Sequence, residues 1–220
     1  MIKYTKMKTL FKLTPSDAQG KRWSATNGEI LPETAALHYL PIEDLIFTEK
    51  IDGTNMGIKI NDNIVEHIQK RNNICNEADK GDNFYFETGN IIVSNIEEKK
   101  IEQLNHVIIY GELCGAKIQK GGNYFSDRRF IVFDIYNILE DKFFTWDAVK
   151  YFANELNIQT VPEIIYNKDN LSVDNVKDFI MNQKSVFNPE FGAEGAVIRY
   201  KNDTCSSRRW MAKIRKKDFR

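Results

Sequence analysis

The feature that most constrains the fold of this 220-residue chain is a stretch with an apolar residue at every second position. This period of two, typical of a strand with one buried face, runs through residues 56–60 (MGIKI). Turn-forming residues follow at 61–63 (NDN), and β-branched residues are frequent in the next segment, 64–71 (IVEHIQKR). We therefore predict an antiparallel hairpin in this part of the chain.

Further strands are predicted where β-branched and aromatic residues cluster. Two such segments are 106–113 (HVIIYGEL) and 129–138 (RFIVFDIYNI). Strand character returns at 192–200 (GAEGAVIRY) and 208–216 (RRWMAKIRK). The strand segments are therefore spread over most of the chain, and the longest interval lies between residues 138 and 192.

Helices are expected only in the gaps between these strands. Thr145 can cap a helix over 145–156, and Ser172 can cap one over 172–180. Residues 83–104 are also expected to be helical, although their periodicity is poor. Many short strands with inserted helices indicate an antiparallel α+β fold. The glycine motifs of dinucleotide-binding and P-loop folds do not occur, so phosphate would have to be bound by side chains.

Nothing in the sequence marks a boundary between two domains, since it has no repeat, low-complexity tract or Pro/Gly-rich linker. We therefore expect a single domain over 1–220, with residues 1–49 as its lead-in. Within that lead-in, residues 38–50 are expected to be extended, because Pro41 disfavours helix at the residue before it.

Composition narrows the setting in which the protein works. The 31 basic residues balance the 31 acidic ones, so any site for a polyanion must be local. The three cysteines form neither a metal-ligand spacing nor a disulfide framework, which indicates a reducing compartment. No stretch is apolar enough to span a bilayer, and the N-terminus does not resemble a signal peptide. We expect no membrane partner and an intracellular protein, either cytoplasmic or virus-encoded within a host cell.

The tetrapeptide KIDG (50–53) raises the question of chemistry. Taken alone it is as typical of a solvated turn as of a reactive lysine. Four further stretches follow it in order, and they are YGELCG (110–115), FIVFDIY (130–136), EGAVIRY (194–200) and MAKIRKKDF (211–219).

This ordered set resembles the covalent nucleotidyltransferase superfamily of ATP-dependent DNA ligases, RNA ligases and mRNA capping enzymes. It is most similar to the RNA ligase type 2 family, with EKIDGTN (49–55) and QKRN (69–72) as further matching blocks. The resemblance implies an antiparallel, ATP-grasp-like ligase adenylylation domain. DNA ligases and capping enzymes usually carry an OB-fold domain after the last block. This sequence stops about where that block ends, so we expect no C-terminal OB domain and favour an RNA ligase.

The resemblance implies a three-step reaction with ATP as cofactor. Lys50 attacks the α-phosphate, AMP passes from Lys50 to a 5′-phosphate RNA end, and a 3′-hydroxyl displaces the AMP. An accessory domain or protein is considered as a further partner. The alternatives are an ATP-dependent DNA ligase, a capping guanylyltransferase, or a catalytically silent nucleic-acid-binding relative.

The basic residues of the last block are expected to contact phosphate. Lys213 and Arg215 lie two apart and therefore on one face of a strand, with Arg209 and Met211 in line. Two cations on one face can bind an α-phosphate, although without the other blocks they would be read as a solvated edge strand. The family usually has lysine where Arg215 stands, and arginine can act only as an electrostatic clamp.

Carboxylates and an aromatic ring complete the expected nucleotide site. By resemblance, Glu194 binds Mg²⁺ or Mn²⁺, with Asp52 as a plausible neighbour, and Glu112 accepts hydrogen bonds from the ribose. Phe133 is expected to stack on adenine. Strict alternation would place Phe133 on the same face as Ile131 and Ile135, so core packing is the competing interpretation.

Five more residues fall on family positions near the nucleotide. Glu49 and Ile51 flank the reactive lysine, whereas Asn55 and Arg71 are expected near phosphate and ribose and could equally serve a turn or a surface ion pair. Arg199 replaces a family lysine, and simple alternation places it on the face opposite Glu194.

Overall fold

The structure is a computed structural model that describes residues 1–15, 23–119 and 124–219. The chain divides into two compact units, which are considered one at a time. Unit 1 comprises Met1–Thr5, Asp52–Val161 and Thr204–Ser207. Unit 2 comprises Lys6–Ile51, Pro162–Asp203 and Arg208–Arg220. The predicted lead-in is therefore shared between the two units, and the single domain over 1–220 stays a prediction.

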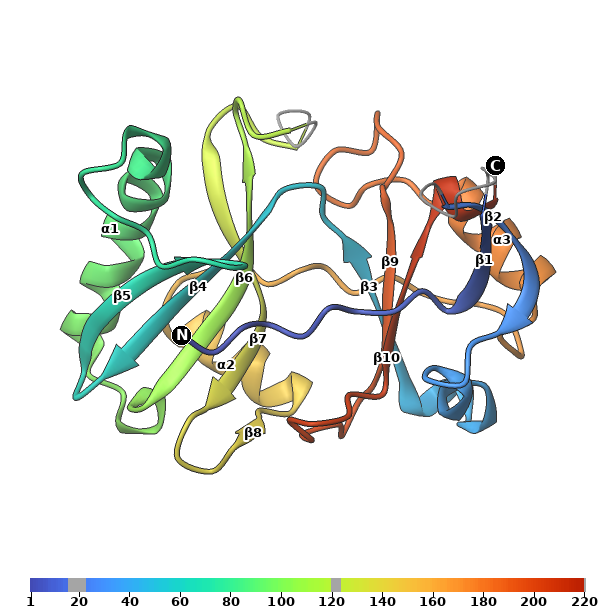
Figure 1. Cartoon of the computed structure of the whole chain (residues 1–220), viewed down its shortest axis with the longest axis horizontal. Helices are drawn as coiled ribbons and strands as arrows, with labels where there is room; N and C mark the ends of the chain where they lie inside the picture. Colours follow the sequence, from blue (N-terminus) through green and yellow to red (C-terminus); the bar gives the residue numbers. More distant parts are fainter. Residues whose placement is uncertain (16–22, 120–123, 220) are drawn as a thin grey trace. The chain divides into compact units, whose positions relative to one another are not determined.

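Unit 1 is built on an antiparallel sheet of five strands in the order β5-β4-β6-β7-β8 (Figure 1). The predicted hairpin is confirmed, and its turn residues Asp62 and Asn63 have φ values of 51° and 60°, the left-handed conformation that tight hairpins need. The strands are β4 (Thr54–Asn61), β5 (Ile64–Lys70), β6 (Val107–Gly115), β7 (Arg128–Asn137) and β8 (Lys142–Phe143).

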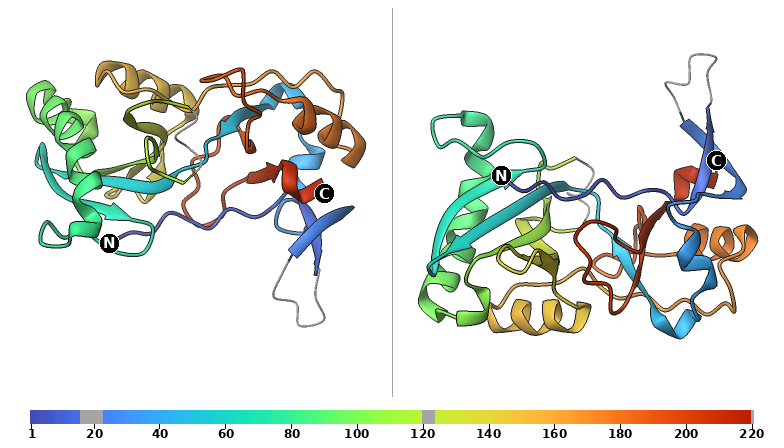
Figure 2. Two further views of the ribbon diagram at one scale, coloured as in Figure 1. Left: turned by 90° about the horizontal axis from the view of Figure 1, so that it is seen from above. Right: turned by 60° about the horizontal axis from the view of Figure 1, so that its bottom comes forward.

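Two helices of unit 1, α1 (Asn83–Lys99) and α2 (Trp146–Glu155), lie on one side of this sheet (Figure 2, left). Helix α1 comes close to the strands at Gly89, where an added Cβ would lie 2.5 Å from the Ile68 side chain. The predicted cap of α2 is confirmed, since Thr145 accepts a hydrogen bond from the Ala148 amide. Short 3₁₀ helices occur at η3 (Lys80–Asp82) and η4 (Glu102–Leu104).

The first residues of the chain cover the other side of the unit 1 sheet. The carbonyl of Ile2 accepts hydrogen bonds from Tyr110 Oη and Gln69 Nε2, both at 2.8 Å. Tyr4 Oη donates to the buried carboxylate of Asp134 at 2.5 Å. Polar groups of the sheet thus find partners in the N-terminal segment, as buried polar groups must.

Unit 2 contains a three-stranded antiparallel sheet in the order β10-β9-β3, one face of which packs on helix α3 (Val173–Asn182). Its strands are β3 (Leu45–Lys50), β9 (Gly195–Tyr200) and β10 (Met211–Arg215). Ser172 caps α3 as predicted. The remaining elements are the pair β1 (Phe11–Pro15) and β2 (Trp23–Ile30) and the 3₁₀ helices η1 (Ala35–Tyr39), η2 (Ile42–Asp44) and η6 (Lys216–Phe219).

Two predictions of secondary structure need correction, and three strands were not predicted. Residues 38–50 are not extended throughout, because η1 and η2 precede β3. The last strand begins at Met211 rather than at residue 208, because Asp203 accepts hydrogen bonds from the Trp210 amide and Arg209 Nε and draws them out of the ladder. Strands β1, β2 and β8 were not predicted, since their segments lack a clear period of two.

No helix within the described residues is long and apolar enough to cross a membrane.

Gly115 offers a direct test of this fold, because its φ of +103° is strained for any residue with a side chain and a Cβ there would lie 1.9 Å from the Asp127 carbonyl oxygen. We expect Gly115→Ala to lower the free energy of unfolding by about 2 kcal/mol or more, measured by urea denaturation. Gly81→Ala is the control, since a Cβ there meets only the Asp79 side chain at 3.1 Å. Equal stability of the two variants would contradict the close contact at Gly115.

Candidate active site

Strand pairing in unit 2 places Lys50, Gly195 and Arg215 in one line across the sheet. Lys50 is the register partner of Gly195 in β9, and Gly195 is in turn the partner of Arg215 in β10. Side chains of directly paired residues lie on the same face of a sheet. Lys50 and Arg215 therefore project from one face on either side of Gly195, and their Cα atoms are about 10 Å apart, the width of two strand spacings.

Gly195 has no room for a side chain. A Cβ there would lie 2.0 Å from the Ile214 carbonyl oxygen and 2.9 Å from the Arg215 Cα. Both obstacles are backbone atoms of β10, which cannot move without breaking the β9–β10 ladder. Glycine at this position is therefore required for the pairing that aligns Lys50 with Arg215.

The Lys50 ammonium forms an ion pair with the Glu194 carboxylate. Both side chains are about three-quarters buried, with 26% and 25% of their surfaces exposed. Glu194 lies one residue before β9 begins, so the alternation of strand side chains does not apply to it. The prediction that Glu194 and Arg199 face opposite ways is therefore wrong, because Glu194 reaches the lysine side of the sheet.

A row of cations continues along this face from Arg215. Lys213 is paired with Val197, which is paired with Thr48, and Arg199 is paired with Ile46 and Met211. Alternate positions along the strands thus put three cations on the face that carries Lys50. They are Arg199, Lys213 and Arg215. Such a row can bind the phosphates of a nucleotide.

Arg209 does not extend this row, contrary to the sequence-based prediction. Its Nε lies 3.1 Å from Asp203 Oδ2, and less than a tenth of either side chain is exposed. The Trp210 amide donates to the same carboxylate oxygen at 2.6 Å. Arg209 is held by Asp203 within the connection between β9 and β10. The row of residues on the Lys50 face therefore ends at Met211.

Glu49 and Ile51 flank Lys50 but do not share its face. Glu49 points to the side of the sheet that packs on the core, where 1% of it is exposed. Its Oε2 accepts a hydrogen bond from the Val186 amide at 2.8 Å, whereas Oε1 is buried without a hydrogen-bond partner among the described residues. Desolvation raises the pKa of this carboxyl group above its usual range. Ile51 is buried directly after β3.

Unit 1 gathers a second group of predicted residues on one face of its sheet. Asn55 and Glu112 are direct register partners in β4 and β6. The β6–β7 register skips Phe133, since Tyr110 pairs with Asp134 and Gly111 with Val132. Phe133 is therefore the extra residue of a β-bulge, and a bulge can redirect a side chain.

The bulge corrects the alternation that was used to argue for Phe133 as a core residue. Ile135 pairs with Ile109, and the adjacent pair is Tyr110 with Asp134. Ile135 therefore faces the side of the sheet opposite to Tyr110 and Asp134. Phe133 is half-buried and packs edge-on against Tyr4, with ring centroids 4.9 Å apart. It therefore lies on the face that carries Glu112, as a base-stacking role requires.

The turn after Lys50 is held by residues that sequence reasoning did not identify. Gln119 Nε2 donates to the Gly53 carbonyl at 2.7 Å, and Tyr124 Oη accepts a hydrogen bond from the Asp52 amide at 3.2 Å. A Cβ on Gly53 would lie 2.5 Å from the Leu113 carbonyl oxygen, so the turn approaches β6 too closely for a side chain. The loop residues have no periodic pattern by which the sequence could have indicated these contacts.

Arg71 lies in an exposed loop after β5 and makes no hydrogen bond or ion pair with the described part of the chain. The loop is organised beside it, because Lys70 Nζ lies 2.5 Å from Asp82 Oδ1 and the Asn76 amide donates to Asp82 Oδ2 at 2.9 Å. The hydrogen bond from Lys70 holds the pKa of Asp82 below its usual range. A free guanidinium on an ordered loop remains available for a ligand. Asn55 Oδ1 is likewise buried without a partner among the described residues.

The predicted site residues thus fall into two groups, one in each unit. The unit 2 group is brought together by strand pairing and consists of Glu49, Lys50, Ile51, Glu194, Arg199, Lys213 and Arg215. The unit 1 group consists of Asp52, Asn55, Arg71, Glu112 and Phe133.

No group of three or more potential metal ligands converges among the residues that the structure describes. Mg²⁺ is commonly held by one or two carboxylates together with substrate phosphates, and hard oxygen donors are what it prefers. The carboxylate of Glu194, beside Lys50, has the chemistry that such an ion needs.

Comparisons with known proteins identify the family and the fold. A family model described as RNA ligase matches residues 43–215. No curated protein matches the chain by sequence. Among solved structures, a mutant of the Naegleria gruberi RNA ligase with ATP and Mn matches with a TM-score of 0.70 and 17% identity over 97% of this chain and 56% of that one.

Two further structures of the same ligase also match. The ligase with PPi gives a TM-score of 0.62 at 20% identity, covering 78% of this chain and 49% of that one. A mutant with AMP and Mn gives 0.66 at 17% identity, covering 93% and 55%. The chain thus spans about half the length of the Naegleria ligase. At these identities the likeness establishes the antiparallel ligase fold.

Burial of Glu49 generates a pH-dependent prediction. Because burial favours the neutral form, the folded pKa lies above the unfolded value of about 4.3, and ionisation destabilises the folded chain increasingly as the pH rises through these two values. We expect Glu49→Gln to be more stable than the unmodified chain at pH 8, with the difference fading below the unfolded pKa. Urea denaturation at both ends of this range measures it.

Glu29→Gln is the matched control, because the exposed Glu29 pairs with Lys12 on the surface of the same unit. Its stability should change little with pH relative to the unmodified chain. If Glu49→Gln instead becomes less stable than the unmodified chain as the pH rises, burial does not destabilise the Glu49 carboxylate, and the prediction is wrong.

Proposed function

The chain belongs to the RNA ligase family, and we propose that it is an ATP-dependent RNA ligase that works through a covalent lysyl-AMP intermediate. The observation that carries the proposal is the line of Lys50, Gly195 and Arg215 across the unit 2 sheet. That line sets a nucleophile two strands away from a cation, on a face that also carries Lys213 and Arg199.

In the first step Lys50 Nζ attacks the α-phosphate of ATP. A P–N bond forms, the bond to the leaving pyrophosphate breaks, and the lysine loses a proton. An amine must be uncharged to attack, so the Lys50–Glu194 ion pair has to open first. Lys213, Arg215 and Arg199 neutralise charge on the phosphates as the transition state forms, which is the main contribution a protein makes to phosphoryl transfer.

Nucleotide recognition is assigned to the unit 1 group and not to Glu49, which lies on the core side of its sheet. Glu112 accepts hydrogen bonds from the ribose hydroxyls, and Phe133 stacks on adenine. The buried acceptor atom Asn55 Oδ1 has no partner among the described residues, so it can receive a donor from the nucleotide. Arg71, which is exposed, is assigned to the phosphates.

A divalent cation, Mg²⁺ or Mn²⁺, would be held by Glu194 with Asp52 as its neighbour. When bound it would neutralise charge on the phosphate oxygens. Glu194 thereby has two roles in the proposal. Its carboxylate binds the Lys50 ammonium when no cation is bound, and it binds the cation when one is present.

In the later steps AMP passes from Lys50 to a 5′-phosphate RNA end, and a 3′-hydroxyl then displaces it. The balanced charge of the chain, 31 basic against 31 acidic residues, offers no broad surface for a polyanion. We therefore propose that an additional domain or partner protein helps to hold the RNA. The proposal also includes a reducing compartment, in keeping with a sequence whose three cysteines form no disulfide framework.

The first test is labelling of the protein with radioactive ATP and, separately, GTP, in the presence of Mg²⁺, followed by denaturing electrophoresis. We expect a covalent adduct with ATP that survives denaturation and disappears in Lys50→Met, because the proposal assigns the nucleophile to Lys50 Nζ. Lys59→Met is the control, since Lys59 forms an ion pair with Glu66 on the unit 1 sheet.

Three outcomes would contradict the assignment. An adduct that survives Lys50→Met would mean another nucleophile, and an adduct only with GTP would indicate a capping guanylyltransferase. No adduct with either nucleotide would indicate a catalytically silent relative.

The second test concerns the polynucleotide. We expect single-turnover joining to be slower than self-adenylylation at physiological salt and to accelerate at lower salt, because few phosphate contacts come from this chain. Strands ending in a 3′-terminal ribose should be joined faster than strands ending in deoxyribose, since the 2′-hydroxyl distinguishes RNA from DNA. Faster joining of DNA ends would point to a DNA ligase instead.

A further inference from the structure

We propose that Asp218 is a positioning residue for ligation, which fixes the guanidinium of Arg215 so that one edge stays available for the nucleotide phosphates. This inference rests on the proposed function, because it assumes that Arg215 contacts phosphate during lysyl-AMP formation. It adds a residue three positions after the end of the family-model match, which covers residues 43–215.

The Asp218 carboxylate holds both the backbone and the side chain of Arg215. Arg215 Nη2 donates to Asp218 Oδ1 at 2.7 Å, and Nε lies 3.0 Å from the same oxygen. The Arg215 amide donates to Oδ2 at 2.9 Å. Nε also lies 3.3 Å from Oδ2. Three side-chain contacts and one backbone contact leave the guanidinium little freedom to rotate.

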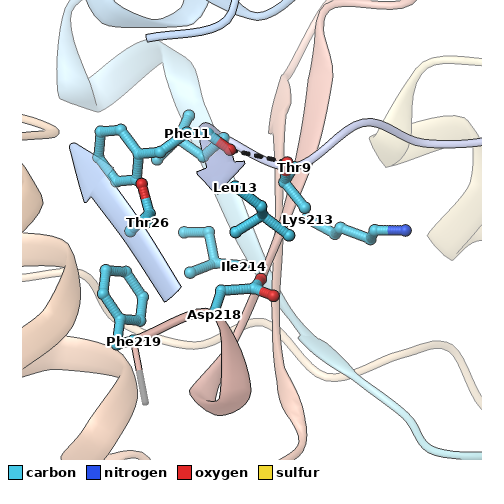
Figure 3. A pocket seen from close by; sticks show the side chains of 9 residues that line it. Thr9, Phe11, Leu13, Thr26, Lys213, Ile214, Asp218 and Phe219 are labelled. Carbon is cyan, nitrogen blue, oxygen red and sulfur yellow. Dashed lines mark hydrogen bonds between the residues drawn. The ribbon is translucent and has the colours of Figure 1, made fainter. Parts of the chain in front are cut away.

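Asp218 is itself fixed by the core of unit 2. It lies in η6, and 4% of its surface is exposed. The next residue, Phe219, packs against the ring of Phe11 with centroids 6.5 Å apart. Figure 3 shows the Asp218 carboxylate beside Ile214 at the edge of a pocket lined mainly by apolar side chains, with the Lys213 side chain extending away from it. The carboxylate is therefore a rigid support rather than a mobile surface group.

The hydrogen bonds to Asp218 use only Nε and Nη2 of the Arg215 guanidinium. Arg215 Nη1 makes no hydrogen bond to any residue that the structure describes, and 19% of the side chain is exposed. Because Arg215 is in line with Gly195 and Lys50, the open nitrogen is carried by the same face of the sheet as the nucleophile. A planar guanidinium can use one edge for a carboxylate and another for a phosphate.

A lysine in place of Arg215 would have to share one ammonium between the two anions. All three of its N–H donors are on a single nitrogen, so a lysine drawn toward the buried Asp218 carboxylate lies farther from the phosphate, whereas a guanidinium offers a separate edge to each anion. Asp218 thus favours arginine over lysine at this position.

The test compares rates of lysyl-AMP formation in the full chain and three variants, Asp218→Asn, Arg215→Lys and the double variant. Asparagine can still accept from the Arg215 amide, so the substitution removes mainly the charge. We expect Asp218→Asn to slow adenylylation about tenfold at saturating ATP. Arg215→Lys should be slower still. The double variant should be faster than Arg215→Lys, because removing the carboxylate releases the lysine ammonium.

The rescue in the double variant is the outcome that a merely structural role would not produce. If Asp218 only stabilised η6, Asp218→Asn would leave the rate of Arg215→Lys per folded molecule unchanged or lower it, and either result would overturn the proposal. Equal or faster labelling of Asp218→Asn than of the unmodified chain would also overturn it. Rates are compared per folded molecule, with the folded fraction measured by near-ultraviolet circular dichroism.

Asp203→Asn is the matched control, since it weakens another buried contact between arginine and aspartate in unit 2. It should lower stability and leave the labelling rate per folded molecule unchanged. The two proposals fail separately. If the unmodified chain forms no adduct, the ligase assignment is wrong, whereas labelling that is indifferent to Asp218 refutes only the positioning role.

Discussion

The arrangement of the candidate active site depends on one constraint, the antiparallel pairing of β9 with β3 on one side and with β10 on the other. This double pairing is possible at Gly195 because the residue has no side chain to meet the β10 backbone. Its register then decides which face each residue of the three strands uses. A slip by one residue would turn Lys50 or Arg215 toward the core.

The energy for holding this register comes from the opposite face of the sheet. There Phe47, Ala196, Ile198, Ala212 and Ile214 join α3 in a continuous apolar core. Complete burial of one large aliphatic or aromatic side chain stabilises the fold by about 1.5–3 kcal/mol, more than an exposed ion pair contributes. The charged groups of the site are therefore positioned by apolar packing behind them, and their mutual contacts adjust only their final orientation.

Much of the architecture could be predicted from the sequence, because hydrophobic periodicity and turn residues act locally. The hairpin of β4 and β5, strands β6, β7 and β9 and the caps at Thr145 and Ser172 are all where these signals indicated. The ordered blocks named Lys50 and Glu194, which the structure brings together as an ion pair. Local signals failed at Phe133, where the bulge depends on pairing with a distant strand, and at Glu194, which lies just outside the strand that was assumed to contain it. The proposed role of Asp218 could not be predicted from the sequence either, since it follows from the hydrogen bonds between Asp218 and Arg215.

The most direct measurement of the central claim is tandem mass spectrometry of the protein after incubation with ATP and Mg²⁺. The account predicts that the mass of AMP is found on the peptide that carries Lys50, with fragment ions that assign it to that side chain. AMP attached to another residue, or recovered only in noncovalent form, would contradict the claim that the register of β3, β9 and β10 builds a nucleotide-transfer site around Lys50.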